Sequence, residues 1–251
     1  MKQLLLPDSY NGEQLYSLSK DDSHYLTRVQ RRDIGYSLSI LSPKGTLYIG
    51  TIVDIVNGIC TLSLTKENDT DKDNKTEIIL FQAIPKGKKI DLMIRQAVET
   101  GVSQFYPISA ENSIPRFNNN GDKEKKRDRW LKIVKEASQQ SGTKKITELQ
   151  PIQSFKDAID SINEPFTGLF FHQVPIGNAP LHNSLTKAQK VVVIVIGPEG
   201  GLSPKEVELL QNHGFIPSLL GTNILRAETA TTFALGAVNM ILNEKDNWII
   251  K

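Results

Sequence analysis

The sequence predicts an α/β protein, in which a mostly parallel sheet carries helices on both faces and a small β-rich domain comes first. Six consecutive aliphatic residues form Val191–Ile196, and a strand apolar on both faces suits the covered interior of a parallel sheet. After residue 75, apolar runs alternate with helical patterns, which is typical of strand–helix units. The segment Lys66–Lys75 contains no large apolar residue. We therefore expect a linker there, between domains at residues 1–70 and 75–251.

The composition and net charge of the sequence exclude several classes of protein. The chain has 251 residues and a formal net charge of only +2, so any nucleic-acid binding must come from local basic clusters. No apolar run approaches the ~20 residues of a membrane span, and the stretch before Pro7 is too short for a signal peptide. Cys60 is the only cysteine, which excludes an intrachain disulfide and a cysteine-based zinc site. We expect a cytoplasmic protein.

The first domain is predicted to be a small barrel or meander of β-strands. Tyr36–Leu41 alternates between apolar and polar residues, Leu47–Val56 is a longer strand, and Ile59–Leu64 returns beside it. Asn57 and Gly58 between the last two runs are a strong hairpin signal.

A basic segment precedes these strands. It carries Arg28, Arg31 and Arg32 at the spacing of a helix or a turn. The three arginines fit one basic edge, and they fit an ordinary solvated helix face as well.

The second domain is predicted to alternate strands and helices. In chain order we expect strand Ile78–Ala83, helix Ile90–Thr100, strand Phe105–Ile108, helix Asp122–Gln140, strand Ile146–Leu149, helix Ser154–Ile162, strand Gly168–His172 and an irregular stretch Pro175–Leu185. A basic loop containing Lys86 follows the first strand, and Arg127 lies in the strongly basic first half of the second helix. Gly101 is expected to end the first helix.

A glycine-rich loop follows the aliphatic strand Val191–Ile196. Its sequence is Gly197-Pro198-Glu199-Gly200-Gly201, and glycines let a backbone bend sharply and stay open to a ligand. Ser203 is placed to be the N-cap of the next helix, with Pro204 at its first position and Glu206 closing a capping box. The unit is a strand, a glycine loop and a capped helix.

A similar pattern recurs further along the chain. The apolar run Phe215–Leu220 is followed by Gly221 and then by a final amphipathic helix. Two such loops at the carboxyl ends of strands are where an α/β sheet binds its ligand, although two ordinary turns fit the spacing equally well. One face of the last helix is expected to carry Ala230, Phe233, Ala234, Ala237, Met240 and Ile241.

Several kinds of chemistry are absent from the sequence. The glycine loop has neither the Gly-Lys-Ser/Thr of a phosphate-binding loop nor the spacing of a dinucleotide motif. It carries Glu199 and no cation, so a ligand with hydroxyls, an adenine edge or a positive centre, held mainly by backbone groups, fits better than a phosphate. The four histidines show no metal-ligand spacing, and we expect no metal.

Two long motifs resemble those of a known family. Ile196–Glu208 reads IGPEGGLSPKEVE and Leu220–Thr229 reads LGTNILRAET. They resemble the paired signature of the SPOUT methyltransferases, and specifically of the family that methylates N3 of a uridine in 16S ribosomal RNA. The segment around His24, Arg28 and Arg31 is similar to that family's H-x-x-x-R-V-x-R sequence. Further likenesses lie at Glu99-Thr100-Gly101-Val102 and Glu136–Ser141.

The resemblance implies a fold, a cofactor and partners. It implies a PUA-like barrel followed by a domain with a deep trefoil knot, in a homodimer whose site lies near the interface. The cofactor is expected to be S-adenosylmethionine, and the partner 16S ribosomal RNA in the decoding region of the small ribosomal subunit. The expected cofactor-binding residues are Ile196, Gly197, Pro198, Glu199, Gly200, Leu220, Gly221, Ile224, Leu225, Thr229 and Ala230. The expected RNA-binding residues are Arg28, Arg31, Lys86 and Arg127.

Arg226 is the expected catalytic residue, because a cation can stabilise the negative uridine that forms when N3 loses its proton. A salt bridge from Arg226 to Glu228, or to a partner subunit, is the alternative. Glu199 is expected either to hold a ligand hydroxyl or to pair with a helix N-terminus, and Thr229 is a candidate cap of the last helix.

The chain departs from the family pattern at several positions. Asn112, Thr143 and Asn223 stand where the family usually has arginine, and Gln96 stands where it has lysine. Asparagine and threonine do not replace the phosphate and base contacts of arginine. An RNA-binding or ribosome-assembly protein of the same fold, with an altered target or weak activity, is therefore the alternative function.

Overall fold

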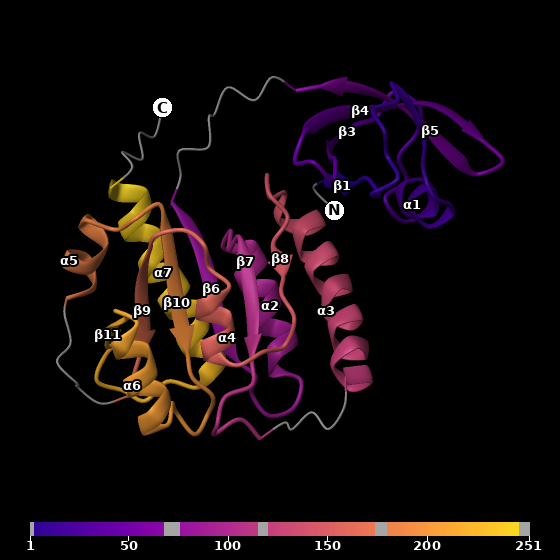
Figure 1. The fold of residues 1–251 in the computed structure, drawn as a ribbon. Coiled ribbons are helices and arrows are strands. Elements are labelled where there is room, and N and C mark those ends of the chain that lie inside the picture. The colour runs from indigo at the N-terminus through magenta and orange to yellow at the C-terminus, as the bar shows by residue number, and fades with distance from the viewer. Residues whose placement is uncertain (1–2, 68–75, 115–119, 174–179, 246–251) are drawn as a thin grey trace. The chain divides into compact units, whose positions relative to one another are not determined.

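The computed structural model describes residues 3–67, 76–114, 120–173 and 180–245 (Figure 1). The chain forms two compact units, one of Met1–Asp73 with Ser138–Lys145 and the other of Asn74–Ala137 with Ile146–Lys251. Of the expected linker, Lys66 is the last residue of a strand, and residues 68–75 lie outside the described residues. None of the described helices combines the length and the apolar character needed to cross a membrane.

The first unit contains a five-stranded sheet in the order β1-β3-β4-β5-β2. Its strands are β1 (Gln3–Leu5), β2 (Leu15–Ser17), β3 (Ser37–Leu41), β4 (Leu47–Val56) and β5 (Ile59–Lys66). Strands β1 and β3 are parallel, and the other pairs are antiparallel. The predicted hairpin is confirmed, because Asn57 and Gly58 have φ angles of 50° and 78° between β4 and β5, as a tight two-residue turn requires.

The core of the first unit is aliphatic and closed by a short helical segment. Helix α1 (Lys20–His24) runs directly into the π-helical turn η1 (Tyr25–Val29). Leu26 on this turn is fully buried, with Ile40, Ile52 and Leu62 of the sheet in the same cluster. Packing of Leu26 therefore fixes the turn that carries Arg28 against the sheet.

The second unit contains a six-stranded sheet in the order β11-β9-β10-β6-β7-β8, with parallel pairing throughout. Its strands are β6 (Glu77–Ala83), β7 (Gln104–Ile108), β8 (Glu148–Leu149), β9 (Phe166–Phe171), β10 (Val191–Ile196) and β11 (Ile216–Ser218). All six residues of β10 are buried. The prediction of a strand covered on both faces is confirmed.

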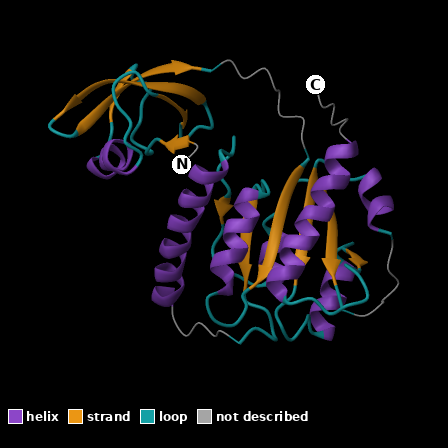
Figure 2. Ribbon diagram, turned by 180° about the vertical axis from the view of Figure 1, so that it is seen from behind, coloured by secondary structure: helices purple, strands orange, loops and turns teal. Residues whose placement is uncertain are grey.

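Helices cover both faces of this sheet (Figures 1 and 2). One face packs against α2 (Lys89–Glu99), α3 (Asn120–Ser141), α5 (Leu181–Thr186) and α7 (Ala227–Lys245), and the other against α4 (Phe155–Asp160) and α6 (Pro204–Asn212). Alternate side chains of β10 enter the two layers: Val192, Ile194 and Ile196 belong to one apolar cluster, and Val191, Val193 and Val195 to the other. This is the two-residue period of a strand with no solvent face.

Some expected elements differ from those observed. The stretch expected to be irregular contains helix α5 at Leu181–Thr186, while residues 174–179 lie outside the described residues. The second long helix begins at Asn120, two residues before the expected start. Helix α7 begins at Ala227, so Thr229 lies inside its first turn and is not its cap.

The apolar side chains expected on one face of α7 differ in burial. Ala234, Leu235 and Val238 are fully buried, whereas Phe233 and Met240 are 54% and 49% exposed. Apolar residues occur around much of this helix, so their period alone does not select the face that meets the sheet.

Candidate functional site

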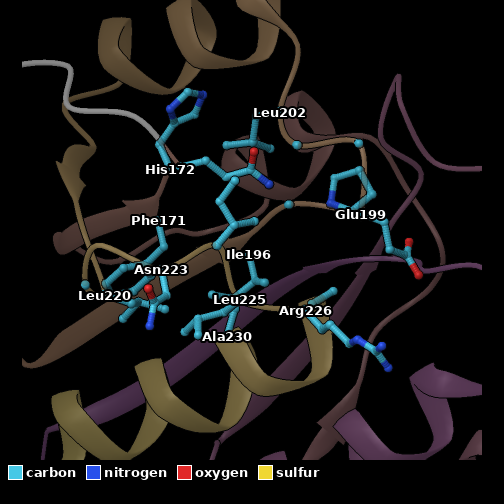
Figure 3. A pocket seen from close by; sticks show the side chains of 18 residues that line it. Phe171, His172, Ile196, Glu199, Leu202, Leu220, Asn223, Leu225, Arg226 and Ala230 are labelled. Carbon is cyan, nitrogen blue, oxygen red and sulfur yellow. The ribbon is translucent and has the colours of Figure 1, made fainter.

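A cavity of about 480 Å³ opens at the carboxyl ends of β9 and β10 (Figure 3). It is lined by Phe171, His172, Gln173, Ile196, Gly197, Pro198, Glu199, Gly200, Gly201, Leu202, Leu220, Gly221, Asn223, Ile224, Leu225, Arg226, Ala227 and Ala230. The structure thus brings both predicted loops to one cavity, at the sheet edge where parallel α/β folds bind ligands.

Every residue expected to bind the cofactor lines this cavity except Thr229. Thr229 is exposed in the first turn of α7. Its neighbours Ala227 and Ala230 do line the cavity, because successive residues of a helix point in different directions.

One wall of the cavity, formed by Phe171, His172 and Gln173 at the end of β9, was not predicted from the sequence. Strand β9 lies beside β10 in parallel register, with Phe171 opposite Ile196. The carboxyl ends of neighbouring parallel strands meet at the same edge, so a sequence signal exists only once the strand order is known.

Two different physical reasons require glycine in these loops. Gly201 and Gly221 have φ angles of 71° and 150°, which side-chain-bearing residues rarely adopt. Gly200 has no such angle; a Cβ there would lie 3.1 Å from Cβ of Asn112, and a Cβ at Gly197 would lie 3.2 Å from Cγ of Leu202. Position 200 therefore requires a residue without a side chain, because the neighbouring loop at Asn112 packs against it.

Asn112 and its neighbour hold the glycine loop from the side of β7. The Asn112 amide donates hydrogen bonds to the carbonyls of Gly200 and Gly201, at 3.3 Å and 3.1 Å. The Glu111 backbone N–H donates to Oε1 of Glu206 at 2.8 Å. Where the family usually has an arginine, this chain has a short side chain that stabilises the loop.

The predicted start of α6 is confirmed in full. The Ser203 hydroxyl accepts a hydrogen bond from the Glu206 backbone at 3.2 Å, and Oε2 of Glu206 accepts one from the Ser203 backbone at 2.8 Å. Pro204 is the first helical residue. This reciprocal cap fixes the end of the glycine loop, because it satisfies donors that the first turn of a helix leaves unpaired.

Glu199 points away from the floor of the cavity toward the start of α2 (Figure 3). Its carboxylate accepts hydrogen bonds from the Lys86 backbone at 3.3 Å and from Nζ of Lys89 at 3.2 Å. Burial tends to raise the pKa of Glu199, but hydrogen bonds from its own backbone, Lys89 and Lys86 more than offset this and lower the pKa below its ordinary value. Glu199 thus pairs with groups at the start of α2, and its expected contact with a ligand hydroxyl stays a prediction.

Arg226 lies at the rim of the cavity, immediately before α7. Its carbonyl accepts a hydrogen bond from the Ala230 N–H at 2.8 Å, and its side chain extends away from Phe171 and Leu220 (Figure 3). The alternative salt bridge to Glu228 is not observed: Glu228 pairs with Lys89 at 3.4 Å, and within the described parts of the chain Arg226 has no ion-pair partner. Its guanidinium is available to a ligand.

A buried polar pair fixes the start of α7 on the sheet. The hydroxyl of Thr231, on α7, donates to Oε1 of Gln82 at 2.7 Å, and both residues are fully buried. Gln82 lies opposite Ile196 in the ladder between β6 and β10. A buried hydrogen bond is costly to leave unmade, so this pair sets where Arg226 and Ala227 lie relative to the glycine loop.

The predicted RNA-binding residues differ in their surroundings. Arg28 and Arg31 are exposed in the first unit, and Lys86 is exposed in the second. Arg127 is half-buried, and its Nη2 donates to the Leu149 carbonyl at 3.5 Å. Three of the four side chains are thus open to a partner, while Arg127 contacts β8.

Within the described residues, no group of three or more His, Cys, Asp or Glu side chains is placed to hold a metal ion.

The fold and the cavity define a class: a parallel α/β domain with a cavity between two glycine-bearing loops at the carboxyl edge of the sheet. Residues 72–239 match the sequence profile of the family described as RNA methyltransferase domain. The chain therefore belongs to this RNA methyltransferase family.

Two curated relatives share most of their length with this chain. It is 31% identical to "Ribosomal RNA small subunit methyltransferase E 2" of Borreliella burgdorferi, over 97% of this chain and 99% of the relative. It is 30% identical to "Ribosomal RNA small subunit methyltransferase E" of Synechocystis sp., over 92% of this chain and 74% of the relative.

Solved structures share the fold. A ribosomal RNA small subunit methyltransferase E from Neisseria gonorrhoeae, bound to S-adenosylmethionine, has a TM-score of 0.80 at 24% identity and covers 96% of this chain and 98% of its own. A methyltransferase from Legionella pneumophila, also with bound S-adenosylmethionine, has a TM-score of 0.77 at 25% identity and covers 95% of this chain and 97% of its own.

We predict that Gly201→Ala weakens ligand binding in the cavity. The substitution forces a left-handed angle on a residue with a side chain, at a cost of about 1–2 kcal/mol, and it distorts a backbone that lines the cavity. Gly214→Ala is the matched control, since Gly214 has a φ of 77°, has no atom within 4 Å of its added Cβ, and lies outside the cavity. Urea unfolding should show similar losses of stability for both. Calorimetry with S-adenosylmethionine should show weaker binding only for Gly201→Ala, and equal affinities would contradict the prediction.

Proposed function

We propose that this protein methylates N3 of a uridine in the decoding region of 16S ribosomal RNA, using S-adenosylmethionine, in the cytoplasm. The observation that carries the proposal is the cavity between two glycine loops in a chain of the RNA methyltransferase family. The names of the relatives and the ligands of the related structures support it.

The lining of the cavity fits S-adenosylmethionine. Apolar side chains of Ile196, Leu220 and Leu225 offer surface to an adenine ring, and the open backbone of the glycine loop offers donors and acceptors. Among the described lining residues, Arg226 is the single lysine or arginine. Because one cation cannot neutralise several phosphate groups, the site is poorly suited to a polyphosphate. When bound, S-adenosylmethionine supplies an electrophilic methyl group.

Arg226 is proposed to stabilise the substrate base. Uridine N3 carries a proton that must leave before the nitrogen can attack, and the remaining negative charge spreads over the ring. An exposed guanidinium without an ion-pair partner in the described chain can approach that charge directly, and fixed charges placed where charge develops are a large catalytic term. The Gln82–Thr231 pair positions the residues around Arg226 before the substrate arrives.

The finer fold assignments are part of the same proposal. We propose that the first domain, residues 1–70, is a PUA-like barrel that binds RNA through Arg28 and Arg31, and that residues 75–251 contain a trefoil knot. The five-stranded mixed sheet and the exposed arginines support the first assignment. The resemblance of Ile196–Glu208 and Leu220–Thr229 to the SPOUT signature supports the second.

A homodimer is proposed through the outer face of α7. Phe233 and Met240 on α7 are 54% and 49% exposed, and Leu92 on α2 is 49% exposed. Helices α2 and α7 pack together, and the Asn239 amide donates to the Thr100 carbonyl at 3.1 Å. Obligate interfaces are more hydrophobic than other protein surfaces.

The alternative function is an RNA-binding or assembly protein of the same fold. Its support is that two positions where the family has arginine are engaged locally: Asn112 bonds the glycine loop, and the Thr143 hydroxyl donates to the Lys145 carbonyl at 2.7 Å. Neither side chain is a cation available to RNA.

Methyl transfer to small subunits that lack the modification tests the proposal. The purified protein should transfer labelled methyl groups from S-adenosylmethionine to 16S ribosomal RNA, and mass spectrometry should locate the methyl on N3 of a uridine. Binding of cofactor and RNA without methyl transfer would favour the alternative function. Absence of cofactor binding would contradict both the proposed function and the alternative.

We predict that Arg226→Ala lowers kcat about 100-fold or more, in the range seen when a charge-stabilising donor is removed. Affinity for S-adenosylmethionine should change little, because the Arg226 side chain extends away from Phe171 and Leu220 at the rim of the cavity. Arg226→Lys should recover part of kcat, and Lys205→Ala, an exposed cation on α6, should leave it unchanged. An active Arg226→Ala enzyme would exclude the catalytic role.

We predict that reversing the charge of Arg28 and Arg31 together, to glutamate, weakens RNA binding and reduces its salt dependence. Each lost phosphate contact removes roughly one unit of the slope of log affinity against log salt. Lys20→Glu with Lys44→Glu makes the same charge change at exposed positions of the same unit and should have a smaller effect. Cofactor affinity should be equal in the wild type and in both double variants. If the two double variants bind RNA equally well, Arg28 and Arg31 make no specific contact with RNA.

We predict that Phe233→Glu with Met240→Glu converts a dimer into a monomer, because the charges cannot be buried in an apolar interface. Sedimentation of the wild-type protein at micromolar concentration should show the dimer. A stable wild-type monomer, or an unaffected dimer in the variant, would place any interface elsewhere.

A further inference from the structure

Lys89 contacts two of the segments that surround the cavity, although it does not line the cavity itself. Its Nζ lies 3.2 Å from Oε1 of Glu199 and 3.4 Å from Oε2 of Glu228. Glu199 belongs to the glycine loop after β10, and Glu228 to the first turn of α7, directly after the second loop. One cation thus joins three segments that are far apart in the sequence.

The start of α2 explains why this cation attracts carboxylates from elsewhere. A helix N-terminus carries partial positive charge and usually has acidic residues in its first turn. Here two lysines, Lys86 and Lys88, precede the helix, and the Lys88 side chain makes no capping hydrogen bond. The acidic residue of the first turn, Asp91, is already paired with Arg129 at 2.6 Å. Glu199 and Glu228 supply the missing negative charge from the two cavity segments.

The bridge is partly shielded from water. The side chains of Lys89, Glu199 and Glu228 are 37%, 33% and 20% exposed. The hydrogen bond to Glu199 is the main reason that the pKa of Lys89 is raised, so Lys89 stays charged across the working range of pH. A charged side chain held between two carboxylates resists separation of the segments that carry them.

We propose that Lys89 is a positioning residue that holds the two cavity-lining segments at the spacing required by the cofactor. It acts through Glu199 and Glu228 and does not touch the ligand. The inference rests on the proposed binding of S-adenosylmethionine in this cavity. Holding the loops in their bound shape raises affinity, because less ordering remains to be done on binding.

Calorimetry with S-adenosylmethionine on the full-length chain tests this role. Lys89→Met should weaken binding about threefold to tenfold, the range expected for losing two partly exposed ion pairs. Lys89→Arg keeps the cation and should recover most of the affinity. Lys88→Met is the matched control, since Lys88 is exposed and its side chain makes no capping hydrogen bond, and its affinity should equal that of the wild type.

A double-mutant cycle separates positioning from general stabilisation. Lys89→Met combined with Glu199→Gln should weaken cofactor binding by less than the product of the two single effects, because both remove one contact. The loss caused by Lys89→Met should appear in KM for the cofactor more than in kcat. If Lys89→Met fails to fold, Glu199→Gln with Glu228→Gln removes the same bridge from its other side and should give a similar loss.

The outcomes distinguish the inference from the proposed function. Tight wild-type binding with equal affinity in Lys89→Met, or with independent effects in the cycle, would overturn the positioning role and leave the proposed function intact. A wild-type protein that does not bind S-adenosylmethionine would overturn the proposed function, and the positioning role with it.

Discussion

The burial of β10 on both faces is the constraint on which the second unit depends. Val192, Ile194 and Ile196 enter one apolar layer, and Val191, Val193 and Val195 enter the other. Neither face can be left to water, so helices must cover both, and β10 must lie inside the sheet between β9 and β6. The glycine loop begins where this strand ends. The position of the cavity is therefore set by the most deeply buried element of the unit.

A loop rich in glycine is flexible by itself, and in this protein neighbouring segments restrain it from outside. Asn112 holds Gly200 and Gly201 from the loop after β7, and Lys86 and Lys89 hold Glu199 from the segment after β6. The capping box at Ser203 and Glu206 closes its far end. Because these contacts lie behind the loop, they stiffen it without occupying the cavity, and its backbone groups stay open to a ligand.

The sequence predicted those features that depend on residues close together in the chain. The strand Val191–Ile196, the turn at Asn57 and Gly58, and the cap at Ser203 are local patterns with a direct physical cause, and the structure confirms them. The wall at Phe171 and the loop contact of Asn112 depend on which strands are neighbours, which no local pattern contains. The apolar period of α7 likewise does not say which of its residues the sheet covers, since Ala234 is buried and Phe233 is exposed.

Apart from Asn223, the residues that form the cavity differ from the positions at which this chain lacks an arginine of the family. The cavity is lined by glycine-loop backbone, by apolar side chains and by a few polar ones, and Asn112, which is not among the lining residues, donates two hydrogen bonds to the loop. Contacts with RNA phosphates depend instead on long cationic side chains. Substitutions at arginine positions can therefore alter recognition of the RNA while the cofactor site keeps its shape.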